Sequence, residues 1–267
     1  MSDGSVGMRA LITGASSGLG VEFARQLAAD GVNLVLTARR ADRLEALAAE
    51  LRERHGVKVE CIPCDLAEPD APERLYRAAL QGGRVQILVN NAGFGQYGEL
   101  TSSSVDVARA MVALNITAVV DLAHRLVSHM LDRPEQRGYV LNVASVAGYQ
   151  PVPGFAVYAA TKAFVQDFSE ALSCELRRTS VSVTQLSPGA TRTEFMKVAG
   201  MRDLQGLMER IAFEDAEPVV RRGLRAMFKG RPSVVSGWLN AITAFLGRVS
   251  PRALSARVSQ RIMHRDP

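Results

Sequence analysis

Cysteine is scarce in this chain of 267 residues, and the three that occur, Cys61, Cys64 and Cys174, are an odd number. Such a set is no disulfide framework of the kind that small secreted domains need. Cys61 and Cys64 match the C-x-x-C spacing of redox motifs, but they end a strand-like run instead of opening a helix, so we expect them to pack. The four histidines show no metal-ligand spacing with one another or with the cysteines, so we expect no metal site.

Long apolar runs are missing as well. No uninterrupted hydrophobic stretch reaches the roughly 20 residues of a membrane-spanning helix. The first residues, 1–7, are small and polar and lack the basic and apolar regions of a secretory leader, so the sequence predicts a cytoplasmic protein. With 47% hydrophobic residues the chain can still bury the core of one large α/β domain.

Acidic residues are almost absent from the C-terminal part. From Pro218 onward, ten Arg and Lys residues accompany the single Asp266, although the whole chain has a net charge of only +5. An apolar stretch, Trp238 to Leu246, is followed by arginines at 248, 252, 257, 261 and 265. This segment is expected either to pack on the domain with a solvated basic face or to lie on anionic lipid as a surface helix. No nucleic-acid-binding motif accompanies the charge, so we expect no nucleic-acid partner.

Short β-rich apolar runs alternate with helical patterns along the chain. The runs predict seven strands, at 10–13, 33–38, 58–63, 87–90, 139–143, 181–186 and 233–236. Helical patterns lie at 19–30, 43–54, 72–80, 105–131 and 155–178. This alternation predicts a single α/β domain with a doubly wound parallel sheet, the Rossmann arrangement, with helices on both faces. We expect a core over about 8–237, a lid over about 190–215 and a basic helical extension over about 238–267.

A glycine-rich turn, Thr13 to Gly20, joins the first strand to the first helix. Glycines there let backbone N–H groups and the helix N-terminus face a pyrophosphate without interference from Cβ atoms. A tight turn without a ligand is the alternative. The residues predicted to bind a dinucleotide here are Gly14, Ser16, Ser17, Gly18, Leu19 and Gly20.

Arg39 and Arg40 follow the second predicted strand. Sites for NAD usually place an acidic side chain here, against the ribose, whereas arginine accommodates the 2′-phosphate of NADP. Arg39, with Arg40 as a second candidate, therefore favours NADP(H), the alternative being a solvated loop arginine.

Ser145, Tyr158 and Lys162 form the candidate reaction centre. Tyr158 and Lys162 lie four residues apart on one face of a predicted helix. A phenol has a pKa of about 10, and a nearby ammonium, helped by a cationic cofactor ring, lowers it. Lowering it to about 7 takes roughly 4 kcal/mol. Ser145, which ends a buried strand, is placed to hydrogen-bond a substrate oxygen. An ordinary core tyrosine beside a solvated lysine is the alternative.

Taken together, the motifs resemble those of the short-chain dehydrogenase/reductase family over about residues 8–195. The matching positions are Thr13–Gly20, Asn90–Gly93, Asn115, Ser145, Tyr158–Lys162 and Pro188–Gly189. The resemblance implies further cofactor contacts from Asp65, Leu66, Asn91, Ala92, Gly93, Pro188, Gly189, and Thr191 or Thr193. It also implies that Asn115 anchors a water, that Lys162 holds the nicotinamide ribose, and that the chain forms dimers or tetramers.

The reaction predicted from both lines of reasoning is hydride transfer between NADPH and a carbonyl or secondary alcohol. Ser145 polarises the carbonyl oxygen and Tyr158 exchanges its proton. Methionines and apolar residues between Gly189 and Ile211 favour a hydrophobic ketone, 3-oxoacyl or steroid-like substrate, unless they form the inner face of a helix pair. A non-catalytic NADP(H) sensor is the main alternative. A nucleotide-sugar epimerase fits less well, because Gly14, Gly18 and Gly20 do not follow its glycine spacing.

Overall fold

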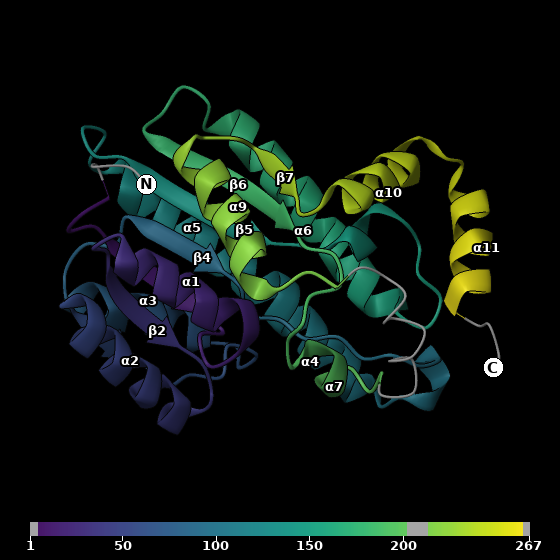
Figure 1. The fold of residues 1–267 in the computed structure, drawn as a ribbon, viewed down its shortest axis with the longest axis horizontal. Helices are drawn as coiled ribbons and strands as arrows, with labels where there is room; N and C mark the ends of the chain where they lie inside the picture. The colour runs from purple at the N-terminus through teal and green to yellow at the C-terminus, as the bar shows by residue number, and fades with distance from the viewer. Residues whose placement is uncertain (1–4, 202–212, 264–267) are drawn as a thin grey trace.

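The computed structural model describes residues 5–201 and 213–263. Its centre is one parallel sheet with the strand order β3-β2-β1-β4-β5-β6-β7 (Figure 1). The strands are β1 (Arg9–Thr13), β2 (Asn33–Thr37), β3 (Val59–Cys61), β4 (Ile87–Asn90), β5 (Gly138–Val143), β6 (Val181–Ser187) and β7 (Ser233–Val235). This order reverses direction between β1 and β4, which confirms the doubly wound Rossmann arrangement.

Strand sequences explain why the sheet is parallel and central. Every residue of β1 and of β4 is buried, as expected for strands covered on both faces. Leu11 of β1 pairs with Val35 on one side and with Leu88 on the other. A continuous apolar run of this kind leaves no face for solvent.

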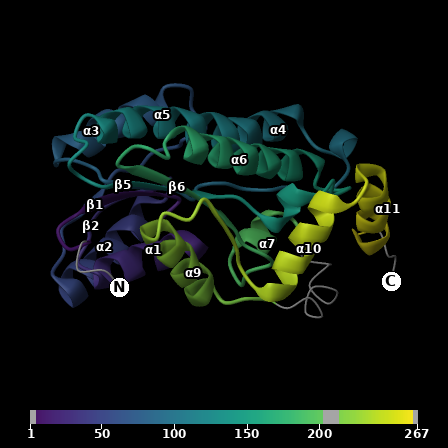
Figure 2. The ribbon, with the colours of Figure 1, turned by 90° about the horizontal axis from the view of Figure 1, so that it is seen from above.

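Helices cover both faces of the sheet, as Figure 2 shows. One layer contains α1 (Gly18–Ala29), α2 (Ala41–His55) and α9 (Ala216–Phe228). The other contains α3 (Ala71–Gln81), α4 (Val105–Val112), α5 (Ala118–Leu131) and α6 (Ala156–Glu175). Each layer shares a hydrophobic cluster with its face of the sheet.

The long helix predicted over 105–131 is interrupted. A π-helical turn, η2 (Ala113–Thr117), separates α4 from α5 and contains the fully buried Asn115. Such turns insert one extra residue and are frequent at functional sites. Periodicity alone could not reveal it, because the apolar spacing continues on both sides.

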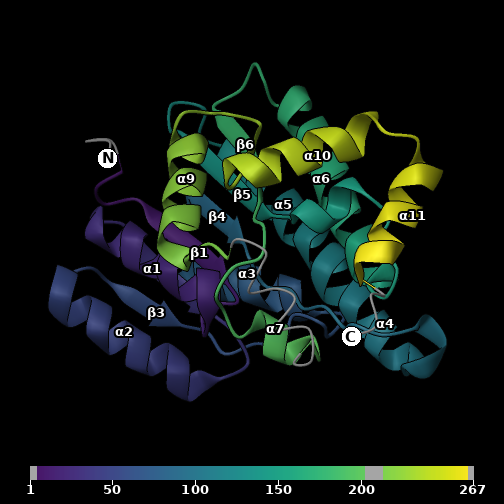
Figure 3. The same cartoon turned by 45° about the vertical axis from the view of Figure 1, so that its right-hand side comes forward.

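The C-terminal segment forms α10 (Trp238–Val249) and α11 (Arg252–Met263) beyond β7. Figure 3 shows both helices at the periphery of the molecule. Within residues 5–201 and 213–263, the helices are all too short or too polar to cross a bilayer.

A chain of buried amides ties the sheet to α6. Asn90 Nδ2 donates to Asn142 Oδ1 at 2.9 Å, and Asn142 Nδ2 donates to Ser169 Oγ at 2.9 Å. All three side chains are at most 3% exposed. Because no water reaches them, each amide depends on its neighbour for its hydrogen bonds.

Asn142→Ala should therefore lower the free energy of unfolding by about 2–3 kcal/mol, since it leaves Asn90 and Ser169 without their partner. Urea unfolding followed by circular dichroism measures the change. Ser128→Ala, on the exposed side of α5, is the control and should cost less than about 0.5 kcal/mol. Equal losses in the two variants would contradict a special role for the buried chain.

Candidate active site

The glycine turn after β1 is held against the end of β4. Thr13 Oγ1 accepts hydrogen bonds from the backbone N–H groups of Asn91 at 3.0 Å and Ala92 at 2.9 Å. The Asn91 side chain donates to the Thr13 carbonyl at 2.8 Å, so it positions the turn. A Cβ atom on Gly14, which has a φ of +68°, would lie 2.9 Å from the Ala92 Cα. Glycine is thus required for this close approach.

The N-terminus of α1 is open to a ligand. Ser17 occupies the N-cap but its side chain makes no capping hydrogen bond, so backbone N–H groups of the first turn are available to an anion. Thr193, in the segment after β6, lies over this turn. A Cβ atom on Gly18 would be 3.1 Å from the Thr193 Cβ. The fold therefore brings Thr193 to the predicted dinucleotide turn.

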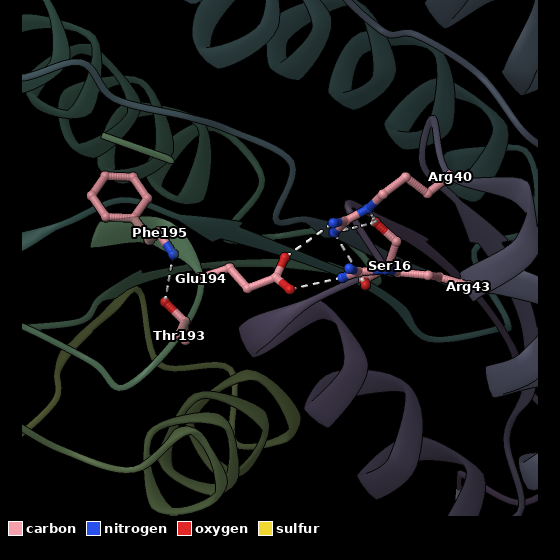
Figure 4. Close-up of polar contacts among 6 residues, drawn as sticks. All are labelled: Ser16, Arg40, Arg43, Thr193, Glu194 and Phe195. Carbon is pink, nitrogen blue, oxygen red and sulfur yellow. Dashed lines mark hydrogen bonds and ion pairs between the residues drawn. The ribbon is translucent and has the colours of Figure 1, made fainter. Parts of the chain in front are cut away.

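Arg40 is the arginine that reaches the glycine turn (Figure 4). Its Nε and Nη2 atoms donate to Ser16 Oγ at 3.2 and 3.1 Å. Its Nη1 donates to Glu194 at 3.0 Å, and Arg43 Nη1 donates to the other oxygen of that carboxylate at 2.8 Å. These hydrogen bonds, Arg43 first and Arg40 second, lower the pKa of Glu194.

Arg39, the first choice from sequence, lies elsewhere. Its Nη1 is 3.8 Å from Asp65 Oδ2, and its side chain is 77% exposed. Asp65 is thus near the same corner, while Leu66 is buried in the core beneath α3. Arg40 is therefore a better candidate than Arg39 for the arginine that contacts a 2′-phosphate, because the start of α2 at residue 41 directs Arg40 toward Ser16.

Arg43 and Glu194 were missed by sequence reasoning. The three-residue spacing of Arg40 and Arg43 at a helix start is the one available signal, since such residues share a face. Glu194 lies 151 residues from Arg43, and no local pattern indicates that pairing.

Ser145, Tyr158 and Lys162 lie together where β5 ends and α6 begins. Ser145 lies close enough to the Tyr158 hydroxyl to lower its pKa. Lys162 Nζ donates to the Val143 carbonyl at 2.8 Å and lies 5.8 Å from the centre of the Tyr158 ring. Tyr158 is 8% exposed and Lys162 is 5% exposed.

Burial controls the proton affinities of this pair. Burial raises the pKa of Tyr158 to about 12, partly offset by the neighbouring Ser145. Burial lowers the pKa of Lys162 to about 8. The expectation that Lys162, together with a cationic cofactor ring, lowers the Tyr158 pKa toward 7 stays a prediction, because the raised value reflects the atoms of the protein alone. Loss of water around the phenol outweighs the amine, which is bonded to a backbone carbonyl instead.

Asn115 lies directly behind Lys162. Its Nδ2 donates to the Phe94 carbonyl and to Thr161 Oγ1, both at 3.0 Å, and its Oδ1 accepts from the Phe94 N–H at 3.1 Å. A Cβ atom on Gly93 would be 3.0 Å from Asn115 Oδ1 and 3.4 Å from Lys162 Nζ. The Asn115 side chain thus fixes the end of β4, and its role in anchoring a water stays a prediction.

Apolar side chains surround the phenol. Rings of Phe155 and Phe195 lie 5.3 and 5.2 Å from the Tyr158 ring, centre to centre. The buried members of this apolar wall are Met111, Phe155, Tyr158, Ala199 and Met201, and Tyr97, Phe195 and Met196 pack against them. Of the predicted lid residues, Leu204, Leu207 and Met208 lie outside the described residues.

The segment after β6 begins beside Ser145. The Pro188 carbonyl accepts from the Val146 N–H at 3.0 Å, and Thr191 Oγ1 donates to the Gly189 carbonyl at 3.0 Å. These residues therefore border the same edge of the sheet as Tyr158, whereas Thr193 alone reaches the glycine turn.

Cys61 and Cys64 are free thiols. Burial raises the pKa of both, that of Cys61 to about 11, which disfavours the reactive thiolate. In the part of the chain that the structure describes, no group of three or more His, Cys, Asp or Glu side chains is arranged to hold a metal ion.

Known proteins with similar sequences are oxidoreductases. A model of the short chain dehydrogenase family matches residues 8–203. Sulfoacetaldehyde reductase of Chromohalobacter salexigens is 42% identical over 191 residues, which are 70% of this chain and 74% of that protein. The 17-beta-hydroxysteroid dehydrogenase type 3 of Mus musculus is 30% identical over 264 residues, which are 97% of this chain and 82% of that protein.

Solved structures agree with this relationship. A short-chain dehydrogenase from Sphingobium yanoikuyae in complex with NADPH has a TM-score of 0.80 and 31% sequence identity. The match covers 92% of this chain and 97% of that one. Because the family model covers most of the chain and the relatives share its sheet, this chain belongs to the short-chain dehydrogenase family of oxidoreductases.

Proposed function

We propose that the chain is an NADP(H)-dependent reductase of a hydrophobic ketone, in which Ser145 and Tyr158 bind the carbonyl oxygen and Tyr158 supplies the proton. The observation that carries this proposal is that Ser145 and Tyr158 are neighbours, set in an apolar wall beside an open dinucleotide turn. A non-catalytic NADP(H) sensor would need the turn but not this buried pair.

The dinucleotide turn fits a nicotinamide cofactor. Gly14 and Gly18 let the turn approach Ala92 and Thr193 closely, and the α1 N-terminus offers N–H groups to a pyrophosphate. Thr193 lies over the glycine turn, and Lys162 Nζ lies 5.8 Å from the centre of the Tyr158 ring. When bound, the cofactor supplies the hydride for carbonyl reduction.

The preference for NADP(H) is supported by the way in which the start of α2 holds a negatively charged side chain, the Glu194 carboxylate. The Glu194 carboxylate accepts hydrogen bonds from Arg40 and Arg43, with Ser16 bonded to the same Arg40 guanidinium (Figure 4). Two guanidinium groups and a hydroxyl are the donors that a 2′-phosphate needs. We expect the phosphate to compete with Glu194 for Arg40 and Arg43.

The direction proposed is reduction. A phenol with its pKa raised to about 12 holds its proton at neutral pH, which is the form required to protonate an alkoxide. Lys162 keeps its charge near pH 7 and holds the backbone of Val143 at the end of β5.

The substrate class is inferred from the apolar wall around Tyr158. The side chains of Phe155, Phe195, Met111 and Met201 around Tyr158 are aromatic or flexible, apolar and uncharged. Among the relatives, one is named for a small aldehyde and the other for a steroid, so the apolar lining decides our choice. We propose a bulky ketone, of the 3-oxoacyl or steroid-like kind.

Assembly into dimers or tetramers is part of the same proposal. Val105 and Val112 of α4 and Phe164 of α6 are exposed apolar residues on the two long helices, as a contact between copies requires. A cytoplasmic location stays a prediction.

Tyr158→Phe should retain NADPH binding and lower the rate of ketone reduction by about 100- to 10,000-fold, because only the proton donor is lost. NADPH fluorescence measures binding, and NADPH absorbance with a panel of ketones measures turnover. Tyr139→Phe, at the opposite end of β5, is the matched control and should keep its rate. An active Tyr158→Phe enzyme, or a wild type that binds NADPH and reduces nothing, would overturn the proposal.

Lys162→Met should change how stability depends on pH. With the folded pKa of Lys162 near 8 and the unfolded value at 10.5, the unfolded chain binds more protons between these values. The contribution of Lys162 to the unfolding free energy of the wild type should therefore rise with pH, by about 2 kcal/mol between about pH 7 and about pH 9.5. Lys162→Met should lose this rise and be more stable near pH 7.

Urea unfolding of the cofactor-free protein at the two pH values tests this expectation. Lys229→Met, which replaces an exposed lysine, should keep the rise. If Lys162→Met keeps it as well, the amine is not a desolvated charge.

Arg40→Ala should weaken NADPH binding by about 10- to 100-fold, the value of a charge-assisted hydrogen bond, and change NADH binding by less than about threefold. Glu194→Gln should tighten NADPH binding by about threefold, because it removes the competing carboxylate. Arg77→Ala on α3 is the control, and Arg39→Ala tests the first choice from sequence. Equal losses for both cofactors in Arg40→Ala would mean that Arg40 only supports the turn.

A further inference from the structure

The two C-terminal helices carry a large exposed apolar surface, which we call the C-terminal apolar face. Trp238 is 73% exposed and Phe245 is 64% exposed. The face consists of Trp238, Leu239, Ile242, Phe245, Leu246, Val249, Leu254 and Val258. Monomeric soluble proteins rarely expose so many large apolar side chains together, and such surfaces usually mark an interaction site.

On α10 the apolar residues are not the ones that hold the helix to the domain. Trp238, Ile242, Phe245 and Val249 follow one another at spacings of four, three and four, so they share one face. The opposite face is small: Ala244 is buried, a Cβ atom on Gly247 would lie 3.0 Å from the Tyr149 carbonyl, and Asn240 packs on Gly189. The helix thus docks on the domain through small residues and turns its apolar face outward.

On α11 the usual pattern is reversed. Ser255 and Ser259 are buried, at 7% and 4% exposure, while Leu254 and Val258 are about half exposed. A helix that only packs on its own domain buries its apolar side chains and exposes its serines. Packing within this chain therefore does not account for the outward face.

The positive charge of α10 and α11 indicates what kind of partner the C-terminal apolar face binds. The sequence from Trp238 to Met263 has no Asp or Glu but contains Arg248, Arg252, Arg257 and Arg261. Arg248 pairs with Glu170 and lies over the Tyr149 ring. The other three form no ion pair with any described residue. Two copies of this face would bring arginines toward arginines, whereas an anionic bilayer offers phosphates to the arginines and an apolar interior to the rest.

We propose that the C-terminal apolar face binds the surface of an anionic lipid bilayer, with α10 and α11 lying on it. The face is accessible, because Figures 1 and 2 both place α11 at the outer edge of the molecule, far from the N-terminus. Trp238 suits the boundary between headgroups and acyl chains. Asn240 packs on Gly189 beside the proposed active site, so a carbonyl compound dissolved in the bilayer would be close to that site.

Co-sedimentation of the full chain with vesicles tests the proposal, and it does not depend on the reaction. We expect binding to vesicles of equal parts phosphatidylcholine and phosphatidylglycerol, and at least about tenfold weaker binding to phosphatidylcholine alone. Phe245→Ser with Val249→Ser should weaken binding at least about tenfold, because apolar area is lost. Val6→Ser with Leu100→Ser, at similarly exposed positions elsewhere, should leave binding unchanged.

The arginines are tested with a charge-matched pair of variants. Arg257→Glu with Arg261→Glu should weaken binding to the anionic vesicles at least about tenfold and remove most of its salt dependence. Arg177→Glu with Arg178→Glu, just after α6, makes the same change in net charge and should have less than about a twofold effect.

Three results would overturn the proposal. One is absence of binding by the wild type, and another is equal loss in the two arginine pairs, which would indicate a general charge effect. The third is a dimer seen by light scattering that Phe245→Ser with Val249→Ser dissociates, without vesicle binding by the wild type. In that case the face joins two copies of the chain.

Discussion

Parallel pairing is the constraint on which this structure depends. Because all seven strands point the same way, their carboxyl ends meet at one edge, and residues far apart in the chain become neighbours there. Thr13 at the end of β1 and Asn91 after β4 meet in this way, and Ser145 follows β5 at the same edge. The sheet holds these ends rigidly because both its faces are buried. The contact between the glycine turn and the segment after β4 is a consequence of this common edge.

Much of the fold was predictable because buried parallel strands are continuous apolar runs. The predicted range 87–90 coincides with β4. Each of the other predicted strand ranges differs from the structure by one to three residues, counting both ends. The helix α9 was missed, since Gly223 and neighbouring arginines mask the spacing of Val219, Leu224 and Met227. A local sequence pattern thus predicts an element when its apolar residues are closely spaced along the chain.

The candidate site was predictable where chemistry is local. Tyr158 and Lys162 share a helix turn, and the glycine spacing of the first turn is itself a backbone requirement. The sequence could not show that Arg40, and not Arg39, reaches the glycine turn, or that Glu194 is its partner. Their contact depends on the direction in which α2 starts and on the course of the segment after β6. The effect of burial on the pKa of Tyr158 was not predictable from sequence either. Sequence gives the charge next to a group but not the water removed from it, and here desolvation is the larger effect.

The π turn between α4 and α5 sets the rotational phase of the two helices. On α4, Met111 faces the apolar wall, while Leu122 and Leu126 of α5 face the sheet. An ordinary helical turn in place of η2 would need one residue fewer and would rotate everything beyond it by about 100°. The one inserted residue therefore lets α4 contact the apolar wall while α5, which continues it, packs on the sheet. A regular helix over the same residues would turn one of these two faces away from its partner.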